Sequence, residues 1–138
     1  MAVPPYRRMS DSDKPLVWIG SCKKDLLAFP TDVQDVMGYA LDLAQRGAKH
    51  PDAKPLKGYK GAGVLEIVDD DDGNTYRGIY TVRFDGVVYA LDAFQKKSPK
   101  GIATAQVDLD RIKRRLKRAE EIYTEWLKER NVDAKANG

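Results

Sequence analysis

Tyrosine, arginine and lysine side chains gather on two neighbouring segments whose residues alternate as in β-strands. The first segment is Tyr76-Arg77-Gly78-Ile79-Tyr80, and the second is Leu91-Asp92-Ala93-Phe94-Gln95-Lys96-Lys97-Ser98. Guanidinium and ammonium groups on rigid strands suit a phosphate-rich partner better than a neutral metabolite, because they donate several hydrogen bonds to phosphate oxygens. The two segments therefore predict a phosphate-binding surface at one end of a sheet.

Other kinds of catalytic site have few candidate residues. Cys22 is the single cysteine and His50 the single histidine, too few for a zinc site of the usual type. A Ser-His-Asp or Cys-His mechanism would have to use His50, which lies in a proline-flanked loop. Residues 69–72 could form a carboxylate-only magnesium site, but we favour a solvated turn there. We expect neither a metal nor a cofactor.

Length and composition indicate one soluble globular domain. The chain has 138 residues, of which 42% are apolar and 33% charged. We expect a flexible tail over residues 1–15, a domain over residues 16–129 and a second tail over residues 130–138. No apolar stretch approaches the roughly 18 residues of a membrane span. No secretory signal is visible, and a lone cysteine fits a reducing compartment, so we expect a cytoplasmic protein.

Positive charge is concentrated near the C-terminal end of the chain. The net charge is only +3, but residues 94–118 hold nine basic side chains opposed by Asp108 and Asp110. The nine are Lys96, Lys97, Lys100, Arg111, Lys113, Arg114, Arg115, Lys117 and Arg118. Such a local surplus is typical of a nucleic-acid surface. A solvated helix face is the alternative.

Hydrophobic periodicity predicts the elements that position these residues. We expect a strand at residues 16–19, a helix at 22–29 capped by Ser21, and a helix that begins with a Thr31–Gln34 capping box and ends at Gly47. Strands follow at residues 64–68, 75–84 and 87–95, with turns at Asp72-Gly73 and Asp85-Gly86. A last helix, capped by Thr104, covers residues 105–129. The fold class is α+β with an antiparallel three-stranded meander.

The second turn permits a prediction of register. If Asp85-Gly86 is a two-residue loop, Tyr80 pairs with Leu91 and Arg77 with Phe94. Alternation then places six large apolar residues on a core face: Tyr76, Tyr80, Val82, Phe84, Tyr89 and Leu91. Arg77, Asp92 and Lys96 fall on the opposite, open face. A bulge in the hairpin would break this assignment.

These segments resemble the phage-derived, HigB-like branch of the RelE/ParE toxin superfamily. The similar motifs are the two strand segments above, Val64-Leu65-Glu66-Ile67, Gly101-Ile102-Ala103-Thr104 and Arg115-Leu116-Lys117-Arg118-Ala119. The resemblance spans residues 16–127 and includes the order of elements. It implies a RelE-like fold and the toxin of a type II toxin–antitoxin pair. Such toxins are metal-independent endonucleases that cleave mRNA on the ribosome, and their partner is a small antitoxin, often of the helix-turn-helix type.

The resemblance also implies roles for individual residues. Catalytic roles fall on Arg77, Lys96, Lys97 and Asp92, and RNA contacts on Lys57, Tyr76, Ser98, Lys100, Arg114 and Arg115. Arg77 would stabilise phosphate charge, and a lysine could protonate the leaving oxygen. The alternatives are an ion pair of Arg77 with Asp92 or Glu66, and a merely solvated Lys57. We expect Tyr80 and Phe94 to pack in the core.

Asp92 departs from the family pattern, because relatives often carry histidine there. A histidine is a natural general base at neutral pH, whereas an aspartate is a weak one unless its pKa is raised. Two other readings therefore stay open. The protein could be an inactive relative that only binds RNA or protein, or a ParE-like topoisomerase inhibitor whose activity is indifferent to Arg77.

Overall fold

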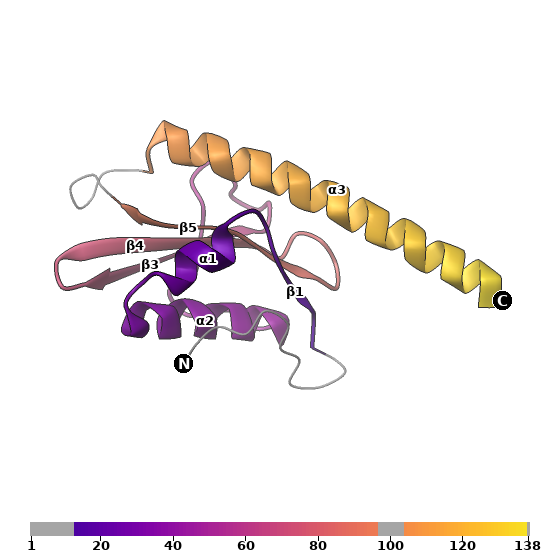
Figure 1. The fold of residues 1–138 in the computed structure, drawn as a ribbon, viewed down its shortest axis with the longest axis horizontal. Coiled ribbons are helices and arrows are strands. Elements are labelled where there is room, and N and C mark those ends of the chain that lie inside the picture. Colours follow the sequence, from indigo (N-terminus) through magenta and orange to yellow (C-terminus); the bar gives the residue numbers. More distant parts are fainter. Residues whose placement is uncertain (1–12, 97–103, 138) are drawn as a thin grey trace.

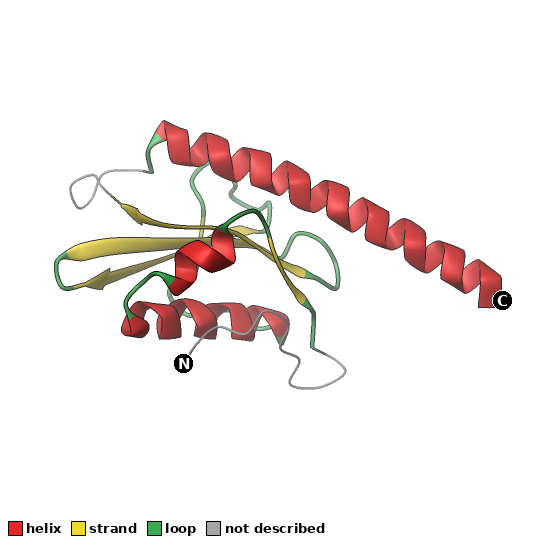
Figure 2. Cartoon of the chain, in the orientation of Figure 1, coloured by secondary structure: helices red, strands yellow, loops and turns green. Residues whose placement is uncertain are grey.

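The computed structural model describes residues 13–96 and 104–137, with side chains described as far as Asn131. A five-stranded sheet lies between helices on its two faces (Figures 1 and 2). The elements in chain order are β1 (Leu16–Trp18), α1 (Cys22–Leu27), α2 (Thr31–Gln45), β2 (Lys54–Pro55), β3 (Val64–Asp71), β4 (Asn74–Thr81), β5 (Val88–Lys96) and α3 (Gln106–Asn137). This arrangement confirms the predicted α+β class and is consistent with a RelE-like fold.

The strands follow the order β1-β5-β4-β3-β2. β1 runs parallel to β5, and the other pairs are antiparallel, which confirms the predicted meander. Asp72 and Gly73 form the β3–β4 turn with φ angles of 48° and 78°, as a two-residue hairpin loop requires. The short strand β2 lies inside the segment that we expected to be a loop.

A β-bulge corrects the predicted register between β4 and β5. Arg77 pairs with Phe94 and Ile79 with Asp92, as predicted, but Tyr80 pairs with Ala90. Leu91 is therefore an extra residue in β5, and the alternation of faces reverses beyond it. The shared face predicted for Tyr80 and Leu91 is wrong.

The Asp85-Gly86 connection is also longer than predicted. β4 ends at Thr81 and β5 begins at Val88, so residues 82–87 form the loop and not Asp85-Gly86 alone. The backbone N–H of Val82 donates instead to the Gly63 carbonyl at 2.9 Å. This longer loop is compatible with the bulge, because neither strand has to keep the register of a two-residue turn.

One hydrophobic cluster lies between the sheet and the helices α1 and α2. Tyr80 belongs to it with the buried face of α2, which includes Val33, Met37, Ala40, Leu41 and Ala44 as the periodicity predicted. Gly78 lets α2 approach β4 closely, since a Cβ there would lie 2.7 Å from the Met37 sulfur. Burial of this apolar surface holds α2 on the sheet.

A second cluster lies between the sheet and α3. It joins the strand residues Ile79, Tyr89 and Leu91 to the helix stripe of Ile112, Leu116 and Ala119. The face that we expected to be open is therefore covered by α3. The C-terminal end of α3 projects past the sheet (Figure 1), and no helix in the described ranges is long and apolar enough to cross a membrane.

The helix ends show three differences from the predictions and one agreement. Gly47, with a φ angle of 80°, follows the C-terminal end of α2 as predicted. The capping box is absent, because Gln34 donates instead to the Leu27 and Phe29 carbonyls. Ser21 makes no capping bond, and its hydroxyl lies 2.7 Å from Asp25 Oδ2. The helix expected to end at residue 129 continues to Asn137.

Candidate functional site

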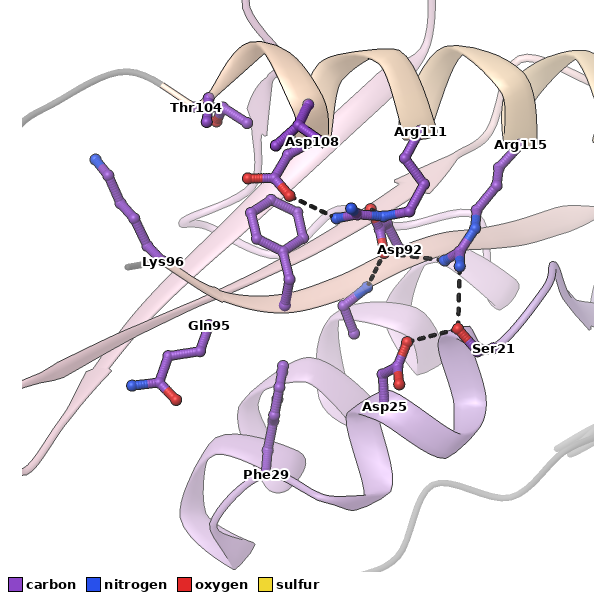
Figure 3. A pocket seen from close by; sticks show the side chains of 14 residues that line it. Ser21, Asp25, Phe29, Asp92, Gln95, Lys96, Thr104, Asp108, Arg111 and Arg115 are labelled. Atoms are coloured by element: carbon purple, nitrogen blue, oxygen red, sulfur yellow. Dashed lines mark hydrogen bonds and ion pairs between the residues drawn. The ribbon is translucent and has the colours of Figure 1, made fainter. Parts of the chain in front are cut away.

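Asp92 on β5 is a buried carboxylate held by two arginines of α3 (Figure 3). Its side chain is only 1% exposed. Arg111 Nε donates to Asp92 Oδ2 at 2.8 Å, and Arg115 Nη1 donates to Oδ1 at 2.9 Å. The backbone N–H of Ala93 also donates to Oδ1, at 3.0 Å. Both carboxylate oxygens are therefore engaged by donors of the protein.

Arg115 extends this network from the sheet to α1. Its Nη1 donates to the Leu91 carbonyl at 2.9 Å, and its Nη2 donates to Ser21 Oγ at 3.0 Å. Gly20 accommodates the guanidinium, since a Cβ there would lie 3.0 Å from Arg115 Nε. Arg115, expected to contact RNA, is thus placed inside the fold, where it joins α1, β5 and α3.

Burial raises the pKa of Asp92 above its ordinary value, and the charges of Arg111 and Arg115 act in the opposite direction. A raised pKa favours a general base, but a group this buried and already hydrogen-bonded has little access to a substrate proton. Asp92 does not pair with Arg77, which was one of the alternatives left open by the sequence. Its geometry fits a structural anchor better than a base.

Arg77 on β4 forms a second ion pair with Glu66 on β3. Arg77 Nη1 donates to Glu66 Oε2 and, at 3.0 Å, to Thr104 Oγ1. The side chains of Arg77 and Glu66 are 12% and 15% exposed. Arg77 Nε is buried and has no hydrogen-bond partner among the described residues. The ion pair with Glu66 foreseen as an alternative is therefore present, and Thr104 serves Arg77 instead of capping α3.

Lys96 lies beside this pair at the end of β5. Removal of water from its ammonium group and repulsion by Arg77 lower the pKa of Lys96, while Glu66 acts in the opposite direction. The structure thus brings Arg77 and Lys96 together, as the sequence indicated, and adds Glu66 and Thr104. Lys97, Ser98 and Lys100 lie outside the described residues.

A groove with a volume of about 630 Å³ opens beside Lys96, between α1 and the start of α3. Figure 3 shows Lys96 and Thr104 at one end and Arg115 and Ser21 at the other. Phe29 and Phe94 contribute aromatic rings to its wall. No pattern in the sequence points to Phe29, because its position in the groove depends on the packing of α1 against β5.

The charges that line the groove largely cancel. Asp25, Asp92 and Asp108 stand against Lys96, Arg111 and Arg115. Arg111 is committed to Asp92 and, through Nη2 at 2.7 Å, to Asp108. Lys96 makes no ion pair within the described part of the chain, so the positive end of the groove is the end nearest to Arg77. This polarity suits a phosphate at the Lys96 end and an uncharged group between the aromatic rings.

The remaining predicted residues lie elsewhere. Tyr76 is 8% exposed and packs on Phe29, with ring centroids 4.8 Å apart. Lys57 is exposed in the connection between β2 and β3, and Arg114 is exposed on α3. Over residues 13–96 and 104–137, no group of three or more His, Cys, Asp or Glu side chains is placed to hold a metal ion.

Comparison with known families places the chain in one of them. Residues 24–117, more than half of the sequence, match the family described as Phage derived protein Gp49-like (DUF891). Searches of curated proteins and of solved structures found no match. The matched range includes the Arg77–Glu66 pair, both arginines of the Asp92 network and every residue that lines the groove except Ser21. The chain therefore belongs to the phage-derived Gp49-like family, a toxin-like family related to the RelE and HigB type.

Proposed function

We propose that this protein is a HigB-like toxin of a type II toxin–antitoxin pair and that it cleaves mRNA on the ribosome without a metal ion. The observation that carries the proposal is the cluster of Arg77, Glu66 and Lys96, which adjoins one end of the groove: Lys96 lines that end, and Arg77 donates to Thr104, which also lines it. It brings a bidentate cation, a carboxylate and a lysine of lowered pKa to one place. These are the groups that RNA cleavage by its own 2′-hydroxyl requires.

The reaction assigned to this cluster is a transfer of the phosphodiester within one RNA chain. Glu66 accepts the proton of the 2′-hydroxyl while the 2′-oxygen forms a bond to phosphorus. Arg77 donates hydrogen bonds to the phosphate oxygens as negative charge develops. Lys96 gives a proton to the 5′-oxygen as its bond to phosphorus breaks. The products are a 2′,3′-cyclic phosphate and a free 5′-hydroxyl.

The groove supplies a place for the base beside the scissile phosphate. Phe29 and Phe94 offer aromatic surface in a region whose charges cancel, and stacking of a base on an aromatic ring contributes about 1–3 kcal/mol. The phosphate then lies toward Lys96. In this assignment Asp92 touches no RNA, so the absence of the family histidine does not remove the catalytic groups.

The proposal includes a partner and a location. A small antitoxin, expected to be of the helix-turn-helix type, neutralises the toxin in the cytoplasm. A neighbouring reading frame that encodes such a protein, and that restores growth when it is co-expressed, supports this part of the proposal.

Induced expression of the protein alone tests the proposed activity. The expected result is growth arrest accompanied by cuts within mRNA coding regions, mapped as new 5′ ends. Arg77→Ala abolishes both effects, and exposed Lys49→Ala is the matched control that leaves them unchanged. Arrest without mRNA cuts contradicts the proposal and favours a ParE-like topoisomerase inhibitor. No arrest at any level of expression favours an inactive relative.

A further inference from the structure

Asp25 differs from the other two carboxylates that line the groove, because no cation of the described residues pairs with it. Both oxygens of Asp92 are engaged by donors of the protein, and Asp108 pairs with Arg111 at 2.7 Å. Within the described part of the chain, only Oδ2 of Asp25 accepts a side-chain hydrogen bond, from Ser21. The Asp25 carboxylate can therefore accept further hydrogen bonds from a ligand in the groove.

The Asp25 carboxylate is also held in a defined orientation. Arg115 Nη2 donates to Ser21 Oγ at 3.0 Å, and the Ser21 hydroxyl donates in turn to Asp25 Oδ2 at 2.7 Å. Figure 3 shows this chain of hydrogen bonds ending at Asp25 on α1. A side chain that is already positioned loses little freedom when it binds a ligand.

The position of Asp25 gives the groove two chemically different ends. Asp25 lies beside Ser21, at the end opposite to Lys96 (Figure 3). A carboxylate without a cation repels phosphate, so it is unfavourable in a groove that binds only a phosphate chain. It is favourable where a ligand presents hydrogen-bond donors. The groove therefore fits a nucleotide with its phosphate at the Lys96 end and a donor-bearing base edge at Asp25.

The aromatic walls of the groove suit a planar base. The guanidinium of Arg111 lies over the Phe94 ring, 5.4 Å from its centroid, and Phe29 packs on Tyr76 with ring centroids 4.8 Å apart. Both rings are therefore braced by neighbouring side chains. The groove volume of about 630 Å³ lies within the range of about 300–1,000 Å³ that is usual for small-ligand sites.

Hydrogen-bonding chemistry distinguishes guanine from the other bases at a carboxylate. Guanine presents two adjacent donors, N1–H and N2–H, which match the two oxygens. Adenine and cytosine place an acceptor nitrogen beside their amino group, and uracil places a carbonyl on each side of its single donor, so each sets a lone pair against the carboxylate. We propose that the groove selects a guanine beside the cleaved phosphate and that Asp25 reads it. The inference rests on the proposed function in taking RNA as the ligand.

Binding of short oligonucleotides tests this assignment without requiring cleavage. Oligouridines that lack 2′-hydroxyl groups carry one central guanine, hypoxanthine or adenine, and fluorescence anisotropy measures their affinities. The guanine oligomer is expected to bind about 5- to 150-fold more tightly than the adenine oligomer, the range of a bidentate base contact. Hypoxanthine, which lacks the 2-amino group, should fall between them.

Two variants of matched chemistry assign the preference to one residue. Asp25→Asn is expected to lose the preference for guanine, because its amide places a donor against a donor of the base. Asp52→Asn makes the same change at an exposed position outside the groove, and it should keep the preference. Equal affinities for the guanine and adenine oligomers, an equal preference in Asp25→Asn, or no measurable binding of any oligomer would overturn the guanine site.

Mapping of the cuts in mRNA separates this inference from the proposed nuclease. The wild type is expected to cut beside guanosines, and the cuts that remain in Asp25→Asn should show no such preference. An uncut messenger, together with a guanine preference in binding that depends on Asp25, rejects the nuclease and supports the guanine site. Cuts without a base preference, together with equal oligomer affinities, support the nuclease and overturn the guanine site.

Discussion

Arg115 on α3 donates a hydrogen bond to the buried Asp92 on β5 at 2.9 Å, and the same guanidinium reaches the Leu91 carbonyl and the Ser21 hydroxyl. Two arginines of α3, Arg111 and Arg115, enclose the buried carboxylate of Asp92. The position is therefore best described as an anchor between α3 and the sheet.

Substitution of Asp92 by alanine is expected to lower the free energy of unfolding by about 3–5 kcal/mol, because it leaves two guanidinium groups without their buried partner. Urea denaturation measures this loss. Asp108→Ala is the control, since Asp108 pairs with Arg111 at a more exposed position and is expected to cost about 1 kcal/mol or less. Equal losses for the two variants would contradict the anchor.

Asp92→Asn separates the structural role from a catalytic one. The variant keeps hydrogen-bonding atoms in the same place, so we expect a loss of stability but an unchanged rate of RNA cleavage for each folded molecule. The rate is measured below the unfolding transition, with the folded fraction determined by circular dichroism. A drop in rate as large as that caused by Arg77→Ala would instead identify Asp92 as a catalytic group.

Glu66→Gln is expected to reduce RNA cleavage by roughly 100- to 10,000-fold, the range of general acid–base contributions. Glutamine can still accept a hydrogen bond from Arg77, so the fold should persist, which a thermal melt verifies. The control Glu125→Gln removes an exposed carboxylate on α3 and leaves the rate unchanged. A Glu66→Gln protein that is folded and fully active would remove Glu66 from the mechanism.

The cleavage rate is expected to fall at alkaline pH as Lys96 loses its proton. The acid form of Lys96 is the reactive one, and the pKa of Lys96 is lowered by loss of water and by Arg77. The decline therefore begins below the pH at which an ordinary lysine titrates. Lys96→Arg should react more slowly and lack this decline, because arginine stays protonated. The same alkaline decline in both proteins would assign it to another group.

Tyr80→Phe is expected to stabilise the protein by about 1 kcal/mol at neutral pH, because the buried Tyr80 hydroxyl has no hydrogen-bond partner among the described residues. Burial also raises the pKa of Tyr80 to about 12. An unfolded tyrosine titrates near pH 10, so stability is full below that pH and falls as the pH rises toward 12.

The phenylalanine variant should weaken the alkaline decline in stability. Denaturation at several pH values between 8 and about 12 measures this change. Tyr39→Phe, at a residue that is 50% exposed, is the control. It should change neither the stability at neutral pH nor the decline in stability at alkaline pH. A loss of stability in Tyr80→Phe at neutral pH would show that the hydroxyl has a partner in solution.

The local pattern of the sequence predicted most helices, strands and turns, whereas the contacts between site side chains depend on tertiary packing. The stripe of α2 and the Asp72-Gly73 turn follow from periodicity and turn chemistry, and both are present. The bulge at Leu91 adds one residue to β5 without a local signal, and it reversed the predicted faces. The pairing between residues 75–79 of β4 and 92–96 of β5 is as predicted, because these residues all lie on one side of the bulge. Arg77 and Lys96 are therefore close together, as the predicted register implied.

The site partners from other elements could not be predicted in the same way. Arg115 and Asp92 are 23 residues apart, and their contact depends on how α3 crosses the sheet. Phe29 enters the groove only because α1 packs beside β5. Basic residues on one helix look alike in sequence, and burial alone separates Arg115 from Arg114.

The rate and product of mRNA cleavage on programmed ribosomes test the central claim most directly. Purified wild-type protein is expected to cut the messenger and leave a 2′,3′-cyclic phosphate, which marks attack by the 2′-hydroxyl. Arg77→Ala should cut at least about 100-fold more slowly because it removes the cation that stabilises the phosphate. An uncut messenger, or equal cutting by Arg77→Ala, would contradict the assignment of this cluster as a ribonuclease site.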